Sequence, residues 1–233
     1  MNRQFVGLVA DLHFTPTEVT RQNLLLENKP DNSIFVVGNS AIDTLNYTID
    51  DCYVSKYDSW VGDDKLILVT VHRRENLDKL EDIFEAFESI CEANSNVKII
   101  YPIHLNPMIR EIASEKLKSS NIKIVEPMGT TEFHNMLNKA YFILTDSGGI
   151  QEEAPSLGVP VLVMRDTTER PEGVSAGTLK LIGTKKEDII EKSLELLNDD
   201  GMYKNMSEVI NPYGDGDTSK KMVNIVGGYF ESK

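Results

Sequence analysis

The feature that most constrains the fold of this chain is a regular alternation of apolar, strand-like runs with helical patterns after residue 60. The strand-like runs cover residues 65–71, 97–101, 121–125, 141–145, 159–163 and 178–181, and helical patterns cover 77–92, 131–138 and 185–197, with another helix starting at Pro107. Continuous apolar strands separated by helices are typical of a parallel sheet that is covered on both faces. This part of the sequence therefore predicts an α/β fold with one complete Rossmann-like parallel-sheet domain.

The first 60 residues show a sparser pattern. Residues 7–14 and 34–37 each predict a single strand, and residues 18–27 predict a helix between them. Two strands cannot form a parallel layer that is buried on both faces. We therefore interpret this segment as the C-terminal remnant of a first Rossmann-like domain, whose incomplete core should expose apolar surface and favour association.

These patterns predict three segments. Residues 1–50 hold the remnant and a linker, residues 51–216 form the complete domain, and residues 217–233 form a C-terminal helix that would cross back to the first domain. A first domain as short as this leads us to expect that the chain is a fragment of a longer protein.

The composition restricts the partners of the chain. Its 24 basic and 37 acidic residues give a formal net charge of −13, which argues against nucleic acid and an anionic membrane surface as partners. No apolar run approaches the roughly 20 residues that span a bilayer, and the N-terminus lacks the layout of a signal peptide. Two cysteines, Cys52 and Cys91, are too few for a disulfide framework or a thiolate metal site, so we expect a cytoplasmic protein.

A glycine-containing turn follows the apolar run 141–145. Ser147, Gly148 and Gly149 come directly after its end and precede a short helical pattern. A strand, a glycine turn and a helix start direct backbone N–H groups at one point, which suits a phosphate. Glu152 and Glu153 follow, where a carboxylate can accept hydrogen bonds from ribose hydroxyls. The alternative is an ordinary capped turn, because short glycine motifs often occur without a ligand.

A basic cluster, residues 72–76, follows the first strand of the complete domain. It contains His72, Arg73 and Arg74, which can donate to phosphate or, for His72, move a proton near neutral pH. In doubly wound sheets the ligand lies beyond the carboxyl ends of the strands, so this cluster should face the same cleft as the glycine turn. A structural histidine, and an arginine that serves only as a salt bridge to Glu75, are the alternatives.

Two further segments lie at the same predicted edge. His104 precedes an Asn-Pro helix start, so it is either a second ligand contact or part of a turn. Arg165 or Arg170 can reach the cleft from the charged segment 165–172, whose alternative role is a solvated loop. His13 and His134 are interpreted as structural. No zinc-ligand spacing and no Ser-His-Asp order is evident, and we predict no metal.

Taken together, several motifs closely resemble the UDP-N-acetylglucosamine 2-epimerases, and they follow in order over nearly the whole chain. The motifs are residues 10–17, 38–43, 70–76, 101–107, 145–158, 165–172 and 211–216. The resemblance implies a GT-B-like fold of two Rossmann-like domains around a cleft. It also implies interconversion of UDP-N-acetylglucosamine and UDP-N-acetylmannosamine without an organic cofactor, by loss of the C2 proton with expulsion of UDP, followed by re-addition. The whole protein would be a homodimer.

The resemblance also assigns residues. Ser147, Gly148 and Gly149 would hold the diphosphate. The remaining UDP contacts would be Glu153 at the ribose hydroxyls, Phe133 beside the uracil, and Arg170. His72 would be catalytic, donating to the departing β-phosphate, while Arg73 and His104 match positions that contact a second, activating substrate molecule in non-hydrolysing bacterial members.

The chain departs from the family pattern at its start, because everything before Asn2 and Arg3 in the family is absent. That portion includes a Gly-Thr-Arg-Pro-Glu segment and the carboxylates proposed to move the C2 proton, so we expect no turnover from this chain by itself. Two alternatives stay open. One is a hydrolysing epimerase that releases N-acetylmannosamine and UDP, and the other is a non-catalytic UDP-sugar-binding module.

Overall fold

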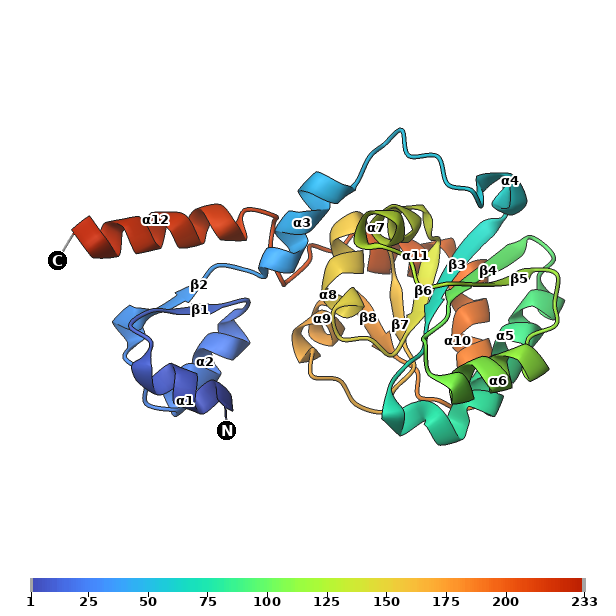
Figure 1. The fold of residues 1–233 in the computed structure, drawn as a ribbon, viewed down its shortest axis with the longest axis horizontal. Coiled ribbons are helices and arrows are strands. Elements are labelled where there is room, and N and C mark those ends of the chain that lie inside the picture. Colours follow the sequence, from blue (N-terminus) through green and yellow to red (C-terminus); the bar gives the residue numbers. More distant parts are fainter. Residues whose placement is uncertain (1, 232–233) are drawn as a thin grey trace. The chain divides into compact units, whose positions relative to one another are not determined.

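The computed structural model of the chain describes residues 2–231 (Figure 1). These divide into two compact units. Unit 1 combines the residues up to Tyr47 with those from Asn211 onward, and unit 2 is Thr48–Ile210. Among residues 2–231, no helix has both the length and the apolar character that a membrane crossing requires.

Unit 2 is built on a six-stranded parallel sheet. In chain order its strands are β3 (Lys65–Thr70), β4 (Val97–Pro102), β5 (Ile122–Val125), β6 (Phe142–Thr145), β7 (Val161–Val163) and β8 (Leu179–Leu181). Their spatial order is β5-β4-β3-β6-β7-β8, which is the strand order of a doubly wound Rossmann-like sheet. The predicted parallel α/β domain is confirmed, and every strand lies within two residues of its predicted ends.

Helices cover both faces of this sheet. They are α4 (Asp58–Val61), α5 (Leu80–Ala93), α6 (Pro107–Lys116), α7 (Thr130–Lys139), α8 (Ile150–Glu153), α9 (Pro171–Ala176), α10 (Lys186–Asn198) and α11 (Asp200–Ser207), with 3₁₀ helices at Arg74–Lys79 and Ala154–Leu157. Local sequence determines several ends: the Asn106 side chain accepts from the Met108 N–H before α6, and Gly158 ends the second 3₁₀ helix with a left-handed φ of 68°.

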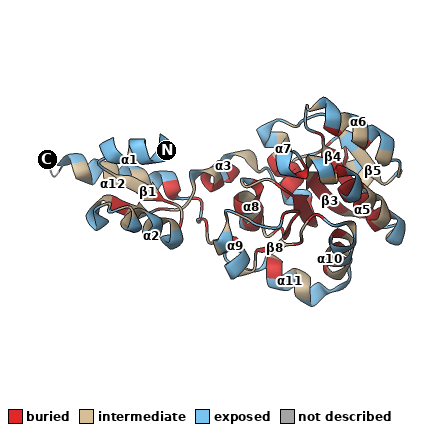
Figure 2. Cartoon of the chain, turned by 90° about the horizontal axis from the view of Figure 1, so that it is seen from below, coloured by how far each residue is buried: buried red, intermediate tan, exposed pale blue. Residues whose placement is uncertain are grey.

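The core consists of two apolar layers, one on each face of the sheet. Figure 2 shows that buried residues concentrate in the strands of unit 2 and in the helices that pack on them. Alternate residues of β3 point to opposite faces: Ile67 packs with α5, α6 and α10, whereas Leu68 packs with α7 and α8. Burial on both faces explains why the strands are continuously apolar.

Unit 1 contains a two-stranded parallel sheet of β1 (His13–Thr15) and β2 (Ile34–Val36). Its helices are α1 (Asn2–Val9), α2 (Glu18–Leu26), a 3₁₀ helix (Asp31–Ser33), α3 (Ser40–Thr48) and α12 (Thr218–Glu231). Asp43 joins α3 to the start of α12, since its carboxylate accepts from the Thr218 N–H at 3.0 Å and the Ser219 N–H at 2.6 Å. Segments from the N-terminal and C-terminal parts of the chain therefore belong to one unit.

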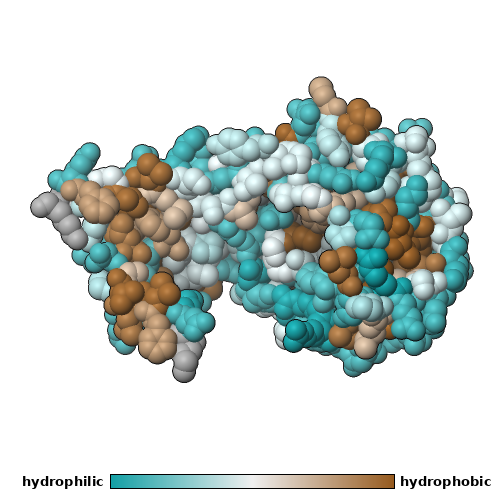
Figure 3. All heavy atoms as spheres, viewed as in Figure 1, coloured by the Kyte–Doolittle hydropathy of each residue, from teal (hydrophilic) through white to brown (hydrophobic). Residues whose placement is uncertain are grey.

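The predictions for this first region were partly wrong. Residues 7–14, predicted as one strand, lie in the end of α1 and the start of β1, and the predicted linker contains α3. A short apolar run does not by itself distinguish a strand from a helix. The predicted exposure of apolar surface is present: Phe5, Leu8 and Val9 of α1 are 61%, 73% and 83% exposed, and apolar side chains gather on unit 1 in Figure 3.

Candidate functional site

The site forms at the point where the strand order of unit 2 reverses. β3 and β6 are neighbours, with Thr70 paired to Thr145 at their carboxyl ends. From there β4 and β5 lie on one side, and β7 and β8 on the other. This topological switch point is where open α/β sheets bind ligands. The basic cluster follows β3 and the glycine turn follows β6, so the structure brings together the two segments that the sequence predicts to converge.

Asp146 joins these two segments directly. Its fully buried carboxylate accepts hydrogen bonds from the backbone N–H groups of His72 (3.0 Å) and Arg73 (2.9 Å) and from Asn76 Nδ2 (3.2 Å). Its Oδ1 also lies 3.2 Å from His72 Nδ1. This contact fixes the imidazole, leaving Nε2 as the nitrogen that can serve a ligand.

Sequence reasoning did not assign a role to Asp146. The available signal was an acidic residue directly after an apolar strand, where burial without partners would be costly. Its partners, His72, Arg73 and Asn76, lie 70 or more positions earlier in the chain. They can therefore be identified only when β3 and β6 are known to be adjacent.

The glycine turn is held in place by its flanks. The Ser147 N–H donates to Thr145 Oγ1 at 2.9 Å, and Gln151 Nε2 donates to the Ser147 carbonyl at 3.0 Å. Among residues 2–231, neither the Gly148 N–H nor the Gly149 N–H has a hydrogen-bond acceptor. Because α8 has only four residues, these N–H groups, rather than a long helix dipole, are the groups that suit an anion.

At Gly148 the surrounding side chains leave little room for a β-carbon. A Cβ added there would lie 3.0 Å from Glu169 Oε1, 3.6 Å from Arg73 Nη2 and 3.7 Å from Arg170 Nη2. Gly149, in contrast, has nothing within 4 Å of an added Cβ. Two arginines and one carboxylate therefore border the turn at Gly148.

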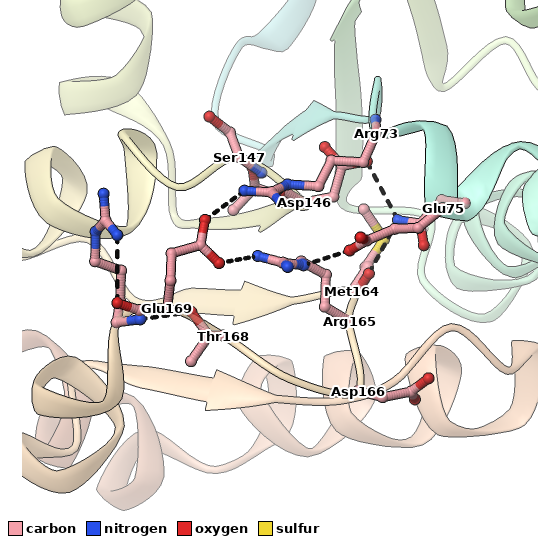
Figure 4. Close-up of polar contacts among 12 residues, drawn as sticks. Arg73, Glu75, Asp146, Ser147, Met164, Arg165, Asp166, Thr168 and Glu169 are labelled. Atoms are coloured by element: carbon pink, nitrogen blue, oxygen red, sulfur yellow. Dashed lines mark hydrogen bonds and ion pairs between the residues drawn. The ribbon is translucent and has the colours of Figure 1, made fainter. Parts of the chain in front are cut away.

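A chain of alternating charges supports this border. It consists of Glu75, Arg165, Glu169 and Arg73, and is here called the Arg165 network (Figure 4). Arg165 Nε donates to Glu75 Oε1 at 2.7 Å, and its Nη1 donates to Glu169 Oε2 at 2.5 Å. Glu169 Oε1 accepts from Arg73 Nη2 at 2.5 Å. Glu75 thus forms its salt bridge with Arg165, and not with Arg73 or Arg74 as considered from the sequence. Arg165 follows β7, which lies beside β6 in the sheet.

Glu152 and Glu153 have different surroundings. Glu152 is paired with Arg170, whereas Glu153 Oε2 lies 3.7 Å from Nε2 of the buried His134. Burial, with the neighbouring Glu152 charge, raises the pKa of Glu153 to about 7. Burial also lowers the pKa of His134, whose Nδ1 lies 2.8 Å from Thr48 Oγ1. The predicted ribose contact is therefore a carboxyl group that changes charge near neutral pH.

His72, His104 and Phe133 line one pocket of about 350 Å³ together with Met128 and Ile150. The His72 and His104 rings are stacked, with centroids 5.9 Å apart. His104 also has the turn role that the sequence offered, because its Nδ1 accepts from the Asn106 N–H at 3.1 Å. The pocket suits a flat, partly apolar group beside the imidazoles. Within residues 2–231, no group of three or more His, Cys, Asp or Glu side chains is placed to hold a metal ion.

The strand order and the polar groups at its switch point define the class: an α/β protein with a GT-B-like, Rossmann-type ligand domain. A sequence model of the family described as UDP-N-acetylglucosamine 2-epimerase matches residues 1–227, and the chain belongs to that family. It is 53% identical over 225 residues to the UDP-N-acetylglucosamine 2-epimerase of Bacillus subtilis, covering 96% of this chain and 59% of the relative.

Solved structures agree with this membership. S. aureus MnaA, in a co-structure with UDP, superposes with a TM-score of 0.95 at 49% identity, covering 99% of this chain and 64% of that one. The UDP-GlcNAc 2-epimerase of Neisseria meningitidis, bound to UDP-GlcNAc, gives a TM-score of 0.88 at 38% identity, covering 97% and 63%. The chain therefore spans about three fifths of the length of these relatives.

Proposed function

We propose that unit 2 binds the UDP group of a UDP-sugar, and that the whole protein interconverts UDP-N-acetylglucosamine and UDP-N-acetylmannosamine. The observation that carries this proposal is the convergence of His72 and the Ser147–Gly149 turn through Asp146 at the switch point of the sheet. Family membership and the UDP present with the S. aureus relative support it.

Each group is suited to one part of the nucleotide. The Gly148 and Gly149 N–H groups and the Ser147 hydroxyl would donate to the diphosphate, with Arg170 nearby. Glu153 would accept from the ribose hydroxyls in its ionised form. Phe133, which borders the pocket beside His72, would lie against the uracil.

His72 would act on the leaving group. When the C2 proton is removed and the C1–O bond breaks, the electron pair of that bond goes to the β-phosphate oxygen. A proton or hydrogen bond from His72 Nε2 would stabilise the charge that develops there, while Asp146 holds the other ring nitrogen. We propose Arg73 and His104 as contacts of a second substrate molecule, which the stacking of His104 on His72 supports. Arg73 Nη2 also lies 3.6 Å from the Cβ position of Gly148, so the same guanidinium would reach the diphosphate at the turn.

Titration of UDP into the purified chain tests the site. We expect binding, and we expect Ser147→Ala to weaken it by roughly tenfold, because a charge-assisted hydrogen bond contributes on the order of 1.5 kcal/mol. Ser175→Ala, at an exposed position of α9, is the matched control and should leave the affinity unchanged. Absence of UDP binding, or equal affinity for the wild type and Ser147→Ala, would contradict the proposed site.

His72→Ala separates binding from chemistry in any preparation that epimerises. We expect kcat to fall at least a hundredfold, since a positioned proton donor contributes about 10²–10⁴-fold, with UDP affinity changed less than about threefold. The measurements are the steady-state rate and the dissociation constant of UDP. Equal losses in both would show that His72 contributes to nucleotide binding and not specifically to the leaving-group step.

The location and the assembly of the whole protein are also proposals. We propose that it is a cytoplasmic homodimer, which the family resemblance and the free thiols of Cys52 and Cys91 support. That the 233 residues alone do not epimerise also stays a prediction, and an assay for UDP-N-acetylmannosamine formation by the purified chain tests it.

A further inference from the structure

The Arg165 network places a negative charge at the edge of a turn that is built to receive an anion. Glu169 Oε1 is the atom closest to the Cβ position of Gly148, at 3.0 Å, and Arg73 Nη2 lies 3.6 Å from the same position. Arg73 also donates from Nε to the Asp146 carbonyl at 2.8 Å. The guanidinium is thus held beside the turn with its charge already paired.

Glu169 differs from Arg73 in having a second cationic partner. Its other oxygen accepts from Arg165, whose side chain is only 8% exposed and also donates to Glu75. Burial acts against ionisation of Glu169, but the hydrogen bonds from Arg165 and Arg73 lower its pKa to about 2. Loss of the Arg73 contact would therefore leave Glu169 still ionised and still paired with Arg165.

Arg73 has the freedom that the exchange of partners requires. Its side chain is 27% exposed, more than that of Arg165, and its contact with the Asp146 carbonyl uses Nε only. A guanidinium has five N–H donors in a fixed planar fork, so a rotation of the whole group about the Nε hydrogen bond would carry Nη2 from the carboxylate to a phosphate oxygen while Nε keeps its bond.

We propose that Glu169 is a positioning residue that holds Arg73 beside the glycine turn, and that Arg73 exchanges Glu169 for a phosphate oxygen when a nucleoside diphosphate binds. Arg165 keeps Glu169 paired during this exchange. The inference rests on the proposed function, because it assumes a diphosphate at Ser147–Gly149. It assigns Glu169 a role opposite to that of an ordinary binding residue, since its charge competes with the ligand for Arg73.

Isothermal titration of UDP into the full 233-residue chain tests this role. We expect Glu169→Gln to tighten UDP binding by roughly three- to tenfold, because the variant keeps the shape of the side chain and removes the competing charge. Asp166→Asn is the matched control: it changes the net charge equally and lies in the same loop, but its side chain is exposed and contacts Lys79 instead of Arg73. It should alter the affinity by less than about twofold.

A double-mutant cycle of Arg73 and Glu169 tests whether the gain in UDP affinity depends on Arg73. In an Arg73→Met background, Glu169→Gln should give no gain, because the exchanged guanidinium is absent. Glu169→Asp keeps the charge but moves it away from Arg73, so it should give a smaller gain in UDP affinity. This variant replaces Glu169→Gln in the test if Glu169→Gln does not fold. Thermal unfolding of each variant identifies folded preparations.

The outcomes separate the two proposals. If Glu169→Gln binds UDP with equal or lower affinity, if Asp166→Asn gives the same gain, or if the gain persists without Arg73, the exchange is overturned while the UDP site stands. If the wild type binds no UDP, or Ser147→Ala has no effect on binding, the proposed site itself fails.

Discussion

Replacing Asp146 with alanine is expected to lower the free energy of unfolding of unit 2 by about 3–5 kcal/mol. The substitution removes a fully buried carboxylate and leaves the N–H groups of His72 and Arg73 and the amide of Asn76 without their acceptor. An unsatisfied donor costs on the order of 1–3 kcal/mol where it is buried, as the Asn76 amide is. Urea denaturation measures the loss as a lower midpoint at unchanged slope.

Asp166→Ala is the matched control, because Asp166 lies just beyond the carboxyl end of β7 but its side chain is 76% exposed. We expect a change within about 0.5 kcal/mol there. If Asp146→Ala does not fold, Asp146→Asn, which keeps one acceptor oxygen, should fold with a smaller loss. A midpoint of Asp146→Asn equal to that of the wild type would show that the carboxylate does not hold the site together.

Replacing Glu153 with glutamine is expected to stabilise the protein at pH 8 by on the order of 2 kcal/mol and to have little effect at pH 5. The folded-state pKa, raised by burial and by Glu152 to about 7, lies above the ordinary value of 4.5. The folded protein therefore retains a proton that the unfolded chain releases between these values. Stability from this group is complete below about pH 4.5 and is lost as the pH rises through 7.

Denaturation of wild type and variant across pH 5–8 measures this difference, and subtraction removes the contributions of other groups. Glu111→Gln, at an exposed position of α6, is the matched control and should change the free energy of unfolding by less than about 0.5 kcal/mol. A stability difference between wild type and Glu153→Gln that does not change with pH would rule out the raised pKa of Glu153. A stability gain combined with weaker UDP binding would show that the ionised carboxyl is maintained for the ligand at a cost in stability.

The sequence allowed prediction of the sheet, because its strands are buried on both faces and are therefore apolar throughout. Placing the basic cluster and the glycine turn at one cleft required only the rule that parallel strands share a carboxyl edge. The Arg165 network and the role of Asp146 could not be predicted in this way. Their contacts join loops after β3, β6 and β7, and the identity of each partner depends on strand order and side-chain direction rather than on spacing.

Unit 1 was harder to predict for a different reason. Phe5, Leu8 and Val9 give an apolar pattern without a buried face in the described residues, so burial does not determine whether that run is a strand or a helix. The bond between Asp43 and α12 joins residues 175 positions apart. No local sequence pattern predicts such a contact, although acidic residues commonly cap the start of a helix.

Because α1 and α12, near the two ends of the described residues, both belong to unit 1, the polypeptide crosses between the units twice, after Tyr47 and before Asn211. Cleavage of either connection alone would therefore leave the two units covalently joined through the other.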